Sequence, residues 1–213
     1  MAQLKVLLIP VTPFQQNCSL VFDDAAKIGA VVDPGGDVPV ILDAVRQAGV
    51  KVEKILLTHG HIDHAGGAAE LKEALGVAIE GPHEADLFLL ETLPQSGARF
   101  GMLEARVVTP DRWLKDGDEV TVGSLRFSVL TAPGHSPGSV VYFSAENRFA
   151  LMGDVLFQGS IGRTDLPGGD HQTLLRSIRD KVFPLGDDVV FLPGHGAASQ
   201  IGEERRNNPF LRD

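Results

Sequence analysis

Cysteine is nearly absent from this chain of 213 residues, because Cys18 is the only one. An intramolecular disulfide is therefore excluded, as is typical of proteins from a reducing compartment. No apolar run approaches the roughly 20 residues that cross a bilayer. Residues 1–11 also lack the longer apolar core and the small-residue cleavage site of a secretory signal. We therefore expect a soluble, cytoplasmic protein that has no membrane partner.

Basic residues are also scarce, since Lys and Arg total 19 against 28 Asp and Glu, which gives a formal net charge of −9. Duplex binding needs a cationic surface that displaces counterions, so we expect no nucleic-acid partner. Hydrophobic residues make up 43% and charged residues 22% of the chain, as in a folded globular protein. No segment has the composition of a linker and no short period repeats, so we expect one domain over residues 1–213.

Turn-forming residues are abundant, with 24 Gly and 13 Pro spread along the chain. Many short elements should follow. The patterns predict strands over 4–10, 19–23, 29–33, 52–58, 77–80, 119–122, 126–131, 140–144, 149–152 and 188–192, and helices over 38–48, 68–75, 84–91, 173–182 and 200–207. Strands come in runs with helices interspersed in both halves, which favours an α/β fold in which helices cover a pair of sheets. The stretch 92–104 shows no such pattern, and we expect a loop or lid there.

Three of the seven histidines fall in the segment Thr58-His59-Gly60-His61-Ile62-Asp63-His64. A chance H-x-H-x-D-H is expected in roughly one of two thousand chains of this composition. Residues two apart on an extended segment face the same side, so His59 and His61 can converge on one metal ion. Asp63 and His64 lie where the chain turns toward the next helix and can face a second ion. Imidazole and carboxylate suit zinc and iron. The alternative is a His-rich surface loop, which is disfavoured by glycines that let the backbone crowd a metal, namely Gly60, Gly66 and Gly67.

Three further polar residues each follow a predicted strand and stand beside a glycine: His135, Asp154 and His195. Each one alone is typical of a loop or a helix cap. A rigid sheet, however, presents side chains at its strand ends into one cleft. Together with the first motif, the three residues are therefore interpreted as additional metal ligands.

These motifs, in this order over residues 59–195, resemble the metallo-β-lactamase superfamily. The resemblance implies an αββα sandwich with a two-metal site at one edge of the sheet pair. It also implies a division of the ligands, in which the first metal is held by His59, His61 and His135, the second by Asp63, His64 and His195, and Asp154 bridges both.

Within the superfamily the chain is most similar to the hydroxyacylglutathione hydrolases, or glyoxalase II enzymes, and above all to their short bacterial forms. Four segments carry this similarity: 13–18 (PFQQNC), 32–36 (VDPGG), 64–67 (HAGG) and 162–165 (GRTD). Only 18 residues follow His195. We therefore expect the short form, which lacks the C-terminal helical domain whose residues grip glutathione in full-length members.

The resemblance implies a metal-dependent hydrolase that cleaves a thioester such as S-lactoylglutathione. Two divalent ions, of zinc, iron or manganese, would bring the pKa of a bound water near neutrality, and the resulting hydroxide would attack the thioester carbonyl. Asp63 and Asp154 would be the catalytic carboxylates. Asp33 and Asp165 are candidates for carboxylates that hydrogen-bond the far nitrogen of a ligating histidine, or else are turn residues. Arg163 would meet an anionic group of the substrate or pair with an acidic neighbour.

The main alternative is an oxidoreductase, a mononuclear iron persulfide dioxygenase on the same fold. Those enzymes share the Gly-Arg-Thr-Asp segment, and here His59, His135 and Asp154 would surround one iron. A β-lactamase is disfavoured because no cysteine ligand follows His135, and a nuclease is disfavoured by the net charge. A structural metal clip is disfavoured because seven ligands exceed what a four-coordinate zinc requires.

Overall fold

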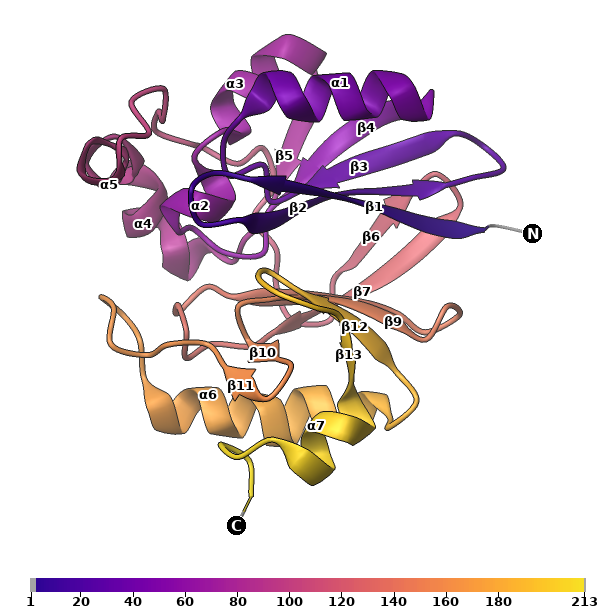
Figure 1. The fold of residues 1–213 in the computed structure, drawn as a ribbon, viewed down its shortest axis with the longest axis vertical. Coiled ribbons are helices and arrows are strands. Elements are labelled where there is room, and N and C mark those ends of the chain that lie inside the picture. Colours follow the sequence, from indigo (N-terminus) through magenta and orange to yellow (C-terminus); the bar gives the residue numbers. More distant parts are fainter. Residues whose placement is uncertain (1–2, 213) are drawn as a thin grey trace.

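The computed structural model describes residues 3–212, which form two facing β-sheets with helices on both outer faces (Figure 1). The αββα sandwich that the resemblance implied is therefore confirmed. The expectation of one domain over residues 1–213 stays a prediction. Among the described residues, no helix combines the length and the apolar character needed to cross a bilayer.

The first sheet has five strands in the order β1-β2-β3-β4-β5. The first three strands are antiparallel, whereas β3, β4 and β5 are parallel neighbours. Parallel neighbours need a crossover, and the helices α1 and α3 supply the two crossovers over the outer face (Figure 1). The bounds are β1 Leu4–Val11, β2 Gln16–Asp23, β3 Ile28–Val32, β4 Lys51–Leu56, β5 Ala78–Glu80, α1 Val38–Ala48, α2 Ile62–Ala65 and α3 Ala68–Leu75.

The second sheet has six strands in the order β13-β12-β9-β8-β7-β6. Among neighbouring strands of this sheet, only β9 and β12 are parallel. The helices α6 and α7 cover its outer face (Figure 1). A ribbon of two short strands, β10 and β11, is separate from both sheets. The bounds are β6 Glu119–Val122, β7 Leu125–Thr131, β8 Val140–Ser144, β9 Phe149–Gly153, β10 Leu156–Phe157, β11 Ser160–Ile161, α6 His171–Ser177, η2 Ile178–Val182, η3 Phe183–Leu185, β12 Val190–Pro193, β13 Ser199–Gln200 and α7 Ile201–Asn207.

The core consists of three apolar layers, because successive strand residues point to opposite faces. In β4, Leu56 packs between the two sheets while Ile55 packs toward α1 and α3. In β8, Tyr142 packs between the sheets while Val141 packs toward α6. Central strands buried on both faces are therefore continuous apolar runs rather than alternating ones.

The segment that follows β5 differs from the sequence expectation. The helix expected over 84–91 is present as a short 3-10 turn, η1 (Glu84–Asp86), followed by α4 (Leu87–Glu91). The loop or lid expected over 92–104 is wrong for most of its length, because α5 spans Leu93–Phe100. Pro94 stands in the first turn of α5, where a missing N–H does not interrupt the helix. Gly97 is required there, since a Cβ would lie 2.4 Å from the carbonyl oxygen of Met102.

Candidate metal centre

The seven predicted ligands meet at one edge of the sandwich. β7, β9 and β12 run in the same direction, so their carboxyl ends lie at the same edge of the second sheet. His135, Asp154 and His195 follow these three ends. The facing sheet contributes the end of β4 and the helix α2, which supply the other four residues: His59, His61, Asp63 and His64.

The first group consists of His59, His61 and His135, whose ring nitrogens converge. His135 Nε2 lies 2.9 Å from His61 Nδ1 and 3.2 Å from His59 Nε2. His59 and His135 are buried, and His61 is partly buried. One nitrogen of each ring lies within 4.8 Å of the others, which is a spacing suited to three ligands of one ion.

The second group consists of Asp63, His64 and His195. Asp63 Oδ2 lies 3.0 Å from His195 Nε2 and 3.7 Å from His64 Nε2. Asp154 lies between the groups, because its carboxylate is 3.4 Å from His64 Nε2 and 3.6 Å from His135 Nε2. The arrangement therefore matches two neighbouring ion sites that share Asp154.

Asp33 orients two of these imidazoles from behind. Its oxygens accept hydrogen bonds from the Thr58 backbone N–H at 2.7 Å and from Thr58 Oγ1 at 2.6 Å. Asp33 Oδ2 also lies 2.9 Å from His64 Nδ1, and Thr58 Oγ1 lies 3.0 Å from His59 Nδ1. Because a carboxylate only accepts, and the Thr58 hydroxyl has already donated to Asp33, both Nδ1 atoms are the donors. His59 therefore presents a bare Nε2 atom to the centre, and His64 does so in its neutral form.

His135 is oriented in the same way, but by a backbone group. Its Nδ1 donates to the carbonyl oxygen of Arg163 at 2.8 Å, which leaves Nε2 free for a metal. Asp165, which was considered either as a partner of a ligating histidine or as a turn residue, makes no hydrogen bond to a histidine among the described residues. It is exposed, and its carboxylate accepts two hydrogen bonds of 2.8 Å from the Arg163 guanidinium. Of the two alternatives considered for Arg163, the structure therefore shows the pairing with an acidic neighbour.

The electrostatics of the centre favour neutral imidazoles on one side and ionised carboxylates on the other. Burial, together with the surrounding histidines, lowers the pKa of His59 well below its ordinary value and that of His61 to about 3. Burial opposes the ionisation of Asp154, but the combined effect of three histidines, with His64 the strongest, holds the pKa of Asp154 well below its usual range. Neutral imidazole and carboxylate are the forms that bind a metal.

His64 shows that the second group attracts positive charge. Burial opposes its protonation, but the carboxylates of Asp154 and Asp63 raise its pKa well above the ordinary value. Burial likewise opposes the protonation of His195, but the hydrogen bond that His195 donates to Asp63, together with the charges of Asp154 and Asp63, raises its pKa. A divalent cation would experience the same negative potential that here favours a proton.

The residues fit metal ions by a further criterion, the satisfaction of buried polar atoms. Among residues 3–212, four buried side-chain nitrogen or oxygen atoms have no hydrogen-bond partner: Gln16 Oε1, His61 Nε2, His64 Nε2 and Asp154 Oδ1. Three of the four belong to predicted ligands. Each such atom costs about 1–3 kcal/mol when it stays unpaired. Their concentration at this one place indicates that the pocket is built around cations.

Asp86 has a role at the site that the sequence did not indicate. It is fully buried and accepts hydrogen bonds from the Gly60 N–H at 2.9 Å, the Gly138 N–H at 2.6 Å and Ser136 Oγ at 2.8 Å. Burial raises the pKa of Asp86, and the three donors oppose that rise. The carboxylate thereby joins the loop of His59 and His61 to the loop of His135. In the sequence it looks like any acidic residue in the first turn of a helix.

Gly194 is the second residue whose importance only the geometry shows. A Cβ at this position would lie 2.1 Å from Asp154 Oδ1 and 2.5 Å from His64 Cε1. Its backbone N–H also donates to the carbonyl oxygen of Gly153 at 2.9 Å, which joins the ends of β12 and β9. The lack of a side chain at Gly194 thus lets two metal-ligand elements pack together.

The centre forms the floor of a cleft of about 1050 Å³. Its walls come from α4, α5, the β10–β11 ribbon and the segments around Phe14 and Leu166. The volume is at the upper end of the range usual for small-molecule sites. The metal centre is therefore open to a substrate rather than enclosed as a structural metal site would be.

Comparisons with known proteins agree with this geometry. The sequence model of the metallo-β-lactamase superfamily matches residues 11–195. The hydroxyacylglutathione hydrolase GloC of Haemophilus influenzae is 46% identical over 209 residues, which cover 98% of each chain. The crystal structure of the BLEG-1 B3 metallo-β-lactamase is 36% identical with a TM-score of 0.90, covering 98% of this chain and 100% of that one. A crystal structure of TTHA1623 in a di-iron-bound form is 35% identical with a TM-score of 0.86, covering 96% of this chain and 100% of that one.

The matches extend over nearly the whole chain and include the strand ends that carry all seven predicted ligands. On these grounds the chain belongs to the metallo-β-lactamase superfamily, as a glyoxalase II-like metallo-hydrolase.

Proposed function

We propose that this protein hydrolyses a thioester of glutathione, such as S-lactoylglutathione, with two divalent metal ions. The observation that carries the proposal is the sharing of Asp154 between two groups of ligands, with three ligand atoms buried and unpaired. The similarity to GloC over 98% of both chains supports the choice of substrate.

The chain's residues have separate tasks in this reaction. When bound, two divalent ions supply a nucleophile at neutral pH and polarise the substrate carbonyl. His59, His61 and His135 would hold one ion, and burial keeps two of them, His59 and His61, neutral. Asp63 and Asp154 supply the negative charge that two cations need.

Positioning comes from the groups behind the ligands. Asp33 accepts the Nδ1 proton of His64, and the Arg163 carbonyl accepts that of His135, so neither ring can rotate without losing a hydrogen bond. Rigid ligands hold the reacting groups in place, which is the main protein contribution to such a reaction.

For the metal, we propose zinc, iron or manganese, since imidazole and carboxylate ligands suit all three. Elemental analysis of the purified protein should give two ions per chain. One iron per chain, with oxygen uptake on glutathione persulfide, would instead support the dioxygenase built on His59, His135 and Asp154.

The decisive experiment measures hydrolysis of S-lactoylglutathione by the metal-loaded protein beside a β-lactam such as nitrocefin. We expect turnover of the thioester, loss of turnover after chelation, and recovery when metal is returned. Efficient turnover of the β-lactam with none of the thioester would overturn the proposal. So would retained thioester turnover in a metal-depleted Asp154→Ala variant.

A further inference from the structure

The helix α5 presents a single stripe of residues to the cleft. Its members recur at intervals of three to four positions along the helix, which places them on one helix face. The residues of α5 and its N-terminal neighbour that line the cleft are Thr92, Gln95, Ser96, Arg99 and Phe100. The opposite face of α5, with Leu93 and Gly97, is buried against the rest of the protein. The stripe is therefore a fixed wall of the cleft.

The charges that line the cleft are unusual for so acidic a protein. Apart from the ligands Asp63 and Asp154, the only acidic or basic lining residues besides histidine are two arginines, Arg99 and Arg163. The whole chain, by contrast, has a formal net charge of −9. With metal ions at its floor, the cleft would be a cationic recess in an anionic surface, which favours anionic substrates.

The two arginines differ in what they are bound to. The Arg163 guanidinium donates two hydrogen bonds of 2.8 Å to Asp165, so a neighbour already neutralises it. Arg99 has no hydrogen bond or ion pair with any other residue in the described range 3–212. Its guanidinium is the one that can offer its full set of donors to a ligand.

Arg99 stands beside an apolar surface made of aromatic rings. The rings of Phe14 and Phe100 meet edge to face with centroids 5.2 Å apart, and Phe88 and Phe157 line the same cleft. Phe14 is 39% and Phe100 51% exposed, so both offer apolar area to a ligand. A ligand with an apolar part along these rings and an anionic end at Arg99 would match both the aromatic surface and the guanidinium.

We propose that Arg99 is a specificity-determining residue that binds a carboxylate on the thiol carrier of the substrate. The substrate class is then a thioester of a small acidic thiol peptide, in preference to thioesters on uncharged carriers. The inference rests on the proposed function and names the residue that recognises the carrier. An arginine fork matches a carboxylate in shape, whereas one arginine cannot neutralise the several phosphates of a nucleotide carrier.

The test compares carriers on the metal-loaded enzyme. The substrates are S-lactoylglutathione, whose carrier bears carboxylates, and S-lactoyl-N-acetylcysteamine, whose carrier is uncharged. In Arg99→Gln we expect the KM for the glutathione thioester to rise about tenfold with kcat nearly unchanged, as for loss of one charge-assisted hydrogen bond. The kcat/KM for the uncharged carrier should stay within about twofold, and Arg99→Lys should restore part of the loss.

Arg46→Gln serves as the matched control, because Arg46 is an exposed arginine on α1, pairs with Asp43 and lies outside the cleft. It makes the same change in net charge and should alter neither KM. An equal loss with both carriers in Arg99→Gln, or no loss with either, would overturn the inference. A loss with lactoyl-coenzyme A as large as that with the glutathione thioester would overturn the assignment to a carboxylate.

A binding experiment separates this inference from the proposed function. S-hexylglutathione is a thioether that cannot be hydrolysed, and calorimetry measures its affinity for the metal-loaded protein. We expect Arg99→Gln to weaken its binding about tenfold and Arg46→Gln to leave it unchanged. If no thioester is hydrolysed but this pattern holds, the proposed reaction fails and the recognition by Arg99 stands. If thioesters are hydrolysed but the two variants bind alike, the recognition fails and the reaction stands.

Discussion

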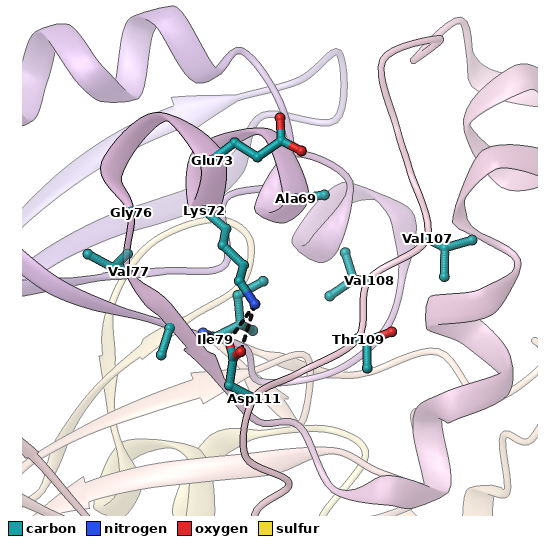
Figure 2. A pocket seen from close by; sticks show the side chains of 11 residues that line it. Ala69, Lys72, Glu73, Gly76, Val77, Ile79, Val107, Val108, Thr109 and Asp111 are labelled. Atoms are coloured by element: carbon teal, nitrogen blue, oxygen red, sulfur yellow. Dashed lines mark hydrogen bonds and ion pairs between the residues drawn. The ribbon is translucent and has the colours of Figure 1, made fainter.

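The metal cleft and a second hollow in the described part of the chain differ in how their polar groups are paired. The second hollow, of about 620 Å³, lies between α3, β5 and the segment 107–111 (Figure 2). There Lys72 Nζ donates to both carboxylate oxygens of Asp111 at 2.7 Å, and Asp111 also accepts from the Ile79 N–H at 2.8 Å (Figure 2). In the metal cleft, by contrast, His61, His64 and Asp154 each keep a buried atom with no partner.

The two hollows are thus both concave, and they differ in whether buried polar atoms of their lining lack a partner. The pair in the second hollow is 37% and 44% exposed, and such pairs contribute about 0–1 kcal/mol. The unpaired atoms of the cleft cost about 1–3 kcal/mol each unless a ligand satisfies them. A ligand that pairs these atoms would offset the cost, so we expect mutations in the metal cleft to have large effects and mutations in the second hollow to have small ones.

The largest expected effect comes from removing a ligand of the centre. His59→Ala and Asp154→Ala should each abolish thioester hydrolysis and lower the bound metal, while the fold stays largely intact. The reason is that each variant removes a side chain that would bind an ion directly. Asp154 also lies next to both ligand groups, through His64 and His135. Metal content, kcat/KM and circular dichroism test this. Full activity in either variant at unchanged metal content would contradict the assignment.

The next largest effect should come from Gly194→Ala, which adds a methyl group against Asp154 and His64. A displacement of about 1 Å at reacting groups can cost a hundredfold in rate, and we expect a fall in kcat/KM of about that size. The control is Gly76→Ala at the second hollow, where φ is +67° and nothing lies within 4 Å of a Cβ. That variant should lose about 1 kcal/mol of stability from backbone strain and no activity. Similar activities for the two variants would count against the role of Gly194.

A smaller effect is expected from Asp86→Asn. The amide would turn an N–H toward a group that is itself a donor, because Asp86 accepts from Gly60, Ser136 and Gly138. We expect at least about a tenfold loss in metal affinity or activity, as for other groups that orient ligand loops. Titration of the metal-free protein with zinc measures the affinity. An unchanged affinity would show that the two ligand loops keep their places without this carboxylate.

The same residue predicts a pH dependence of stability. Burial raises the pKa of Asp86 above its ordinary value, so the folded state holds its proton more tightly than the unfolded state. The associated stability is complete below the unfolded pKa of about 3.9 and is lost as the pH rises through the folded pKa. In metal-free protein, the free energy of unfolding of the wild type relative to Asp86→Asn should therefore fall as the pH rises above about 4. Denaturant titrations at several pH values check this, and a relative stability that rises with pH would be the opposite of what we expect.

The smallest effect is predicted for the second hollow. Lys72→Met breaks the pair with Asp111 but leaves the Asp111 bond to the Ile79 N–H. We expect a change in the free energy of unfolding of at most about 1 kcal/mol and no change in kcat/KM. A loss of activity comparable to that of Asp86→Asn would contradict the expectation that only the metal cleft serves catalysis.

Much of the site could be predicted because its ligands are marked by local sequence. The H-x-H-x-D-H motif places four ligands within six residues, and His135, Asp154 and His195 each follow a glycine at the end of a strand. Both signals depend on residue type and short-range spacing. The sandwich followed from strand runs and interspersed helices, together with the family resemblance, and the structure confirms it.

The rest could not be predicted because it depends on contacts between distant residues. α5 was missed because Pro94 and Gly97 disfavour a helix in isolation. In the fold, Pro94 is tolerated because it stands in the first turn of the helix, and Gly97 is needed because Met102 lies too close for a side chain. Asp165 was considered either as a carboxylate behind a histidine or as a turn residue. The His135 Nδ1 instead contacts the backbone carbonyl of Arg163, a group that every residue has and that no sequence pattern marks.

Residue types and their spacing along the chain, together with the family resemblance that they carry, were thus sufficient to predict the candidate metal ligands and the layered fold. The roles of Asp86, Gly194 and Arg99 became visible only when the two sheets were brought together. Asp86 reaches Gly138 across 52 positions of sequence, and Gly194 meets Asp154 from a different strand. Such contacts depend on which segments pack side by side, and that is a property of the whole core rather than of any local stretch of chain.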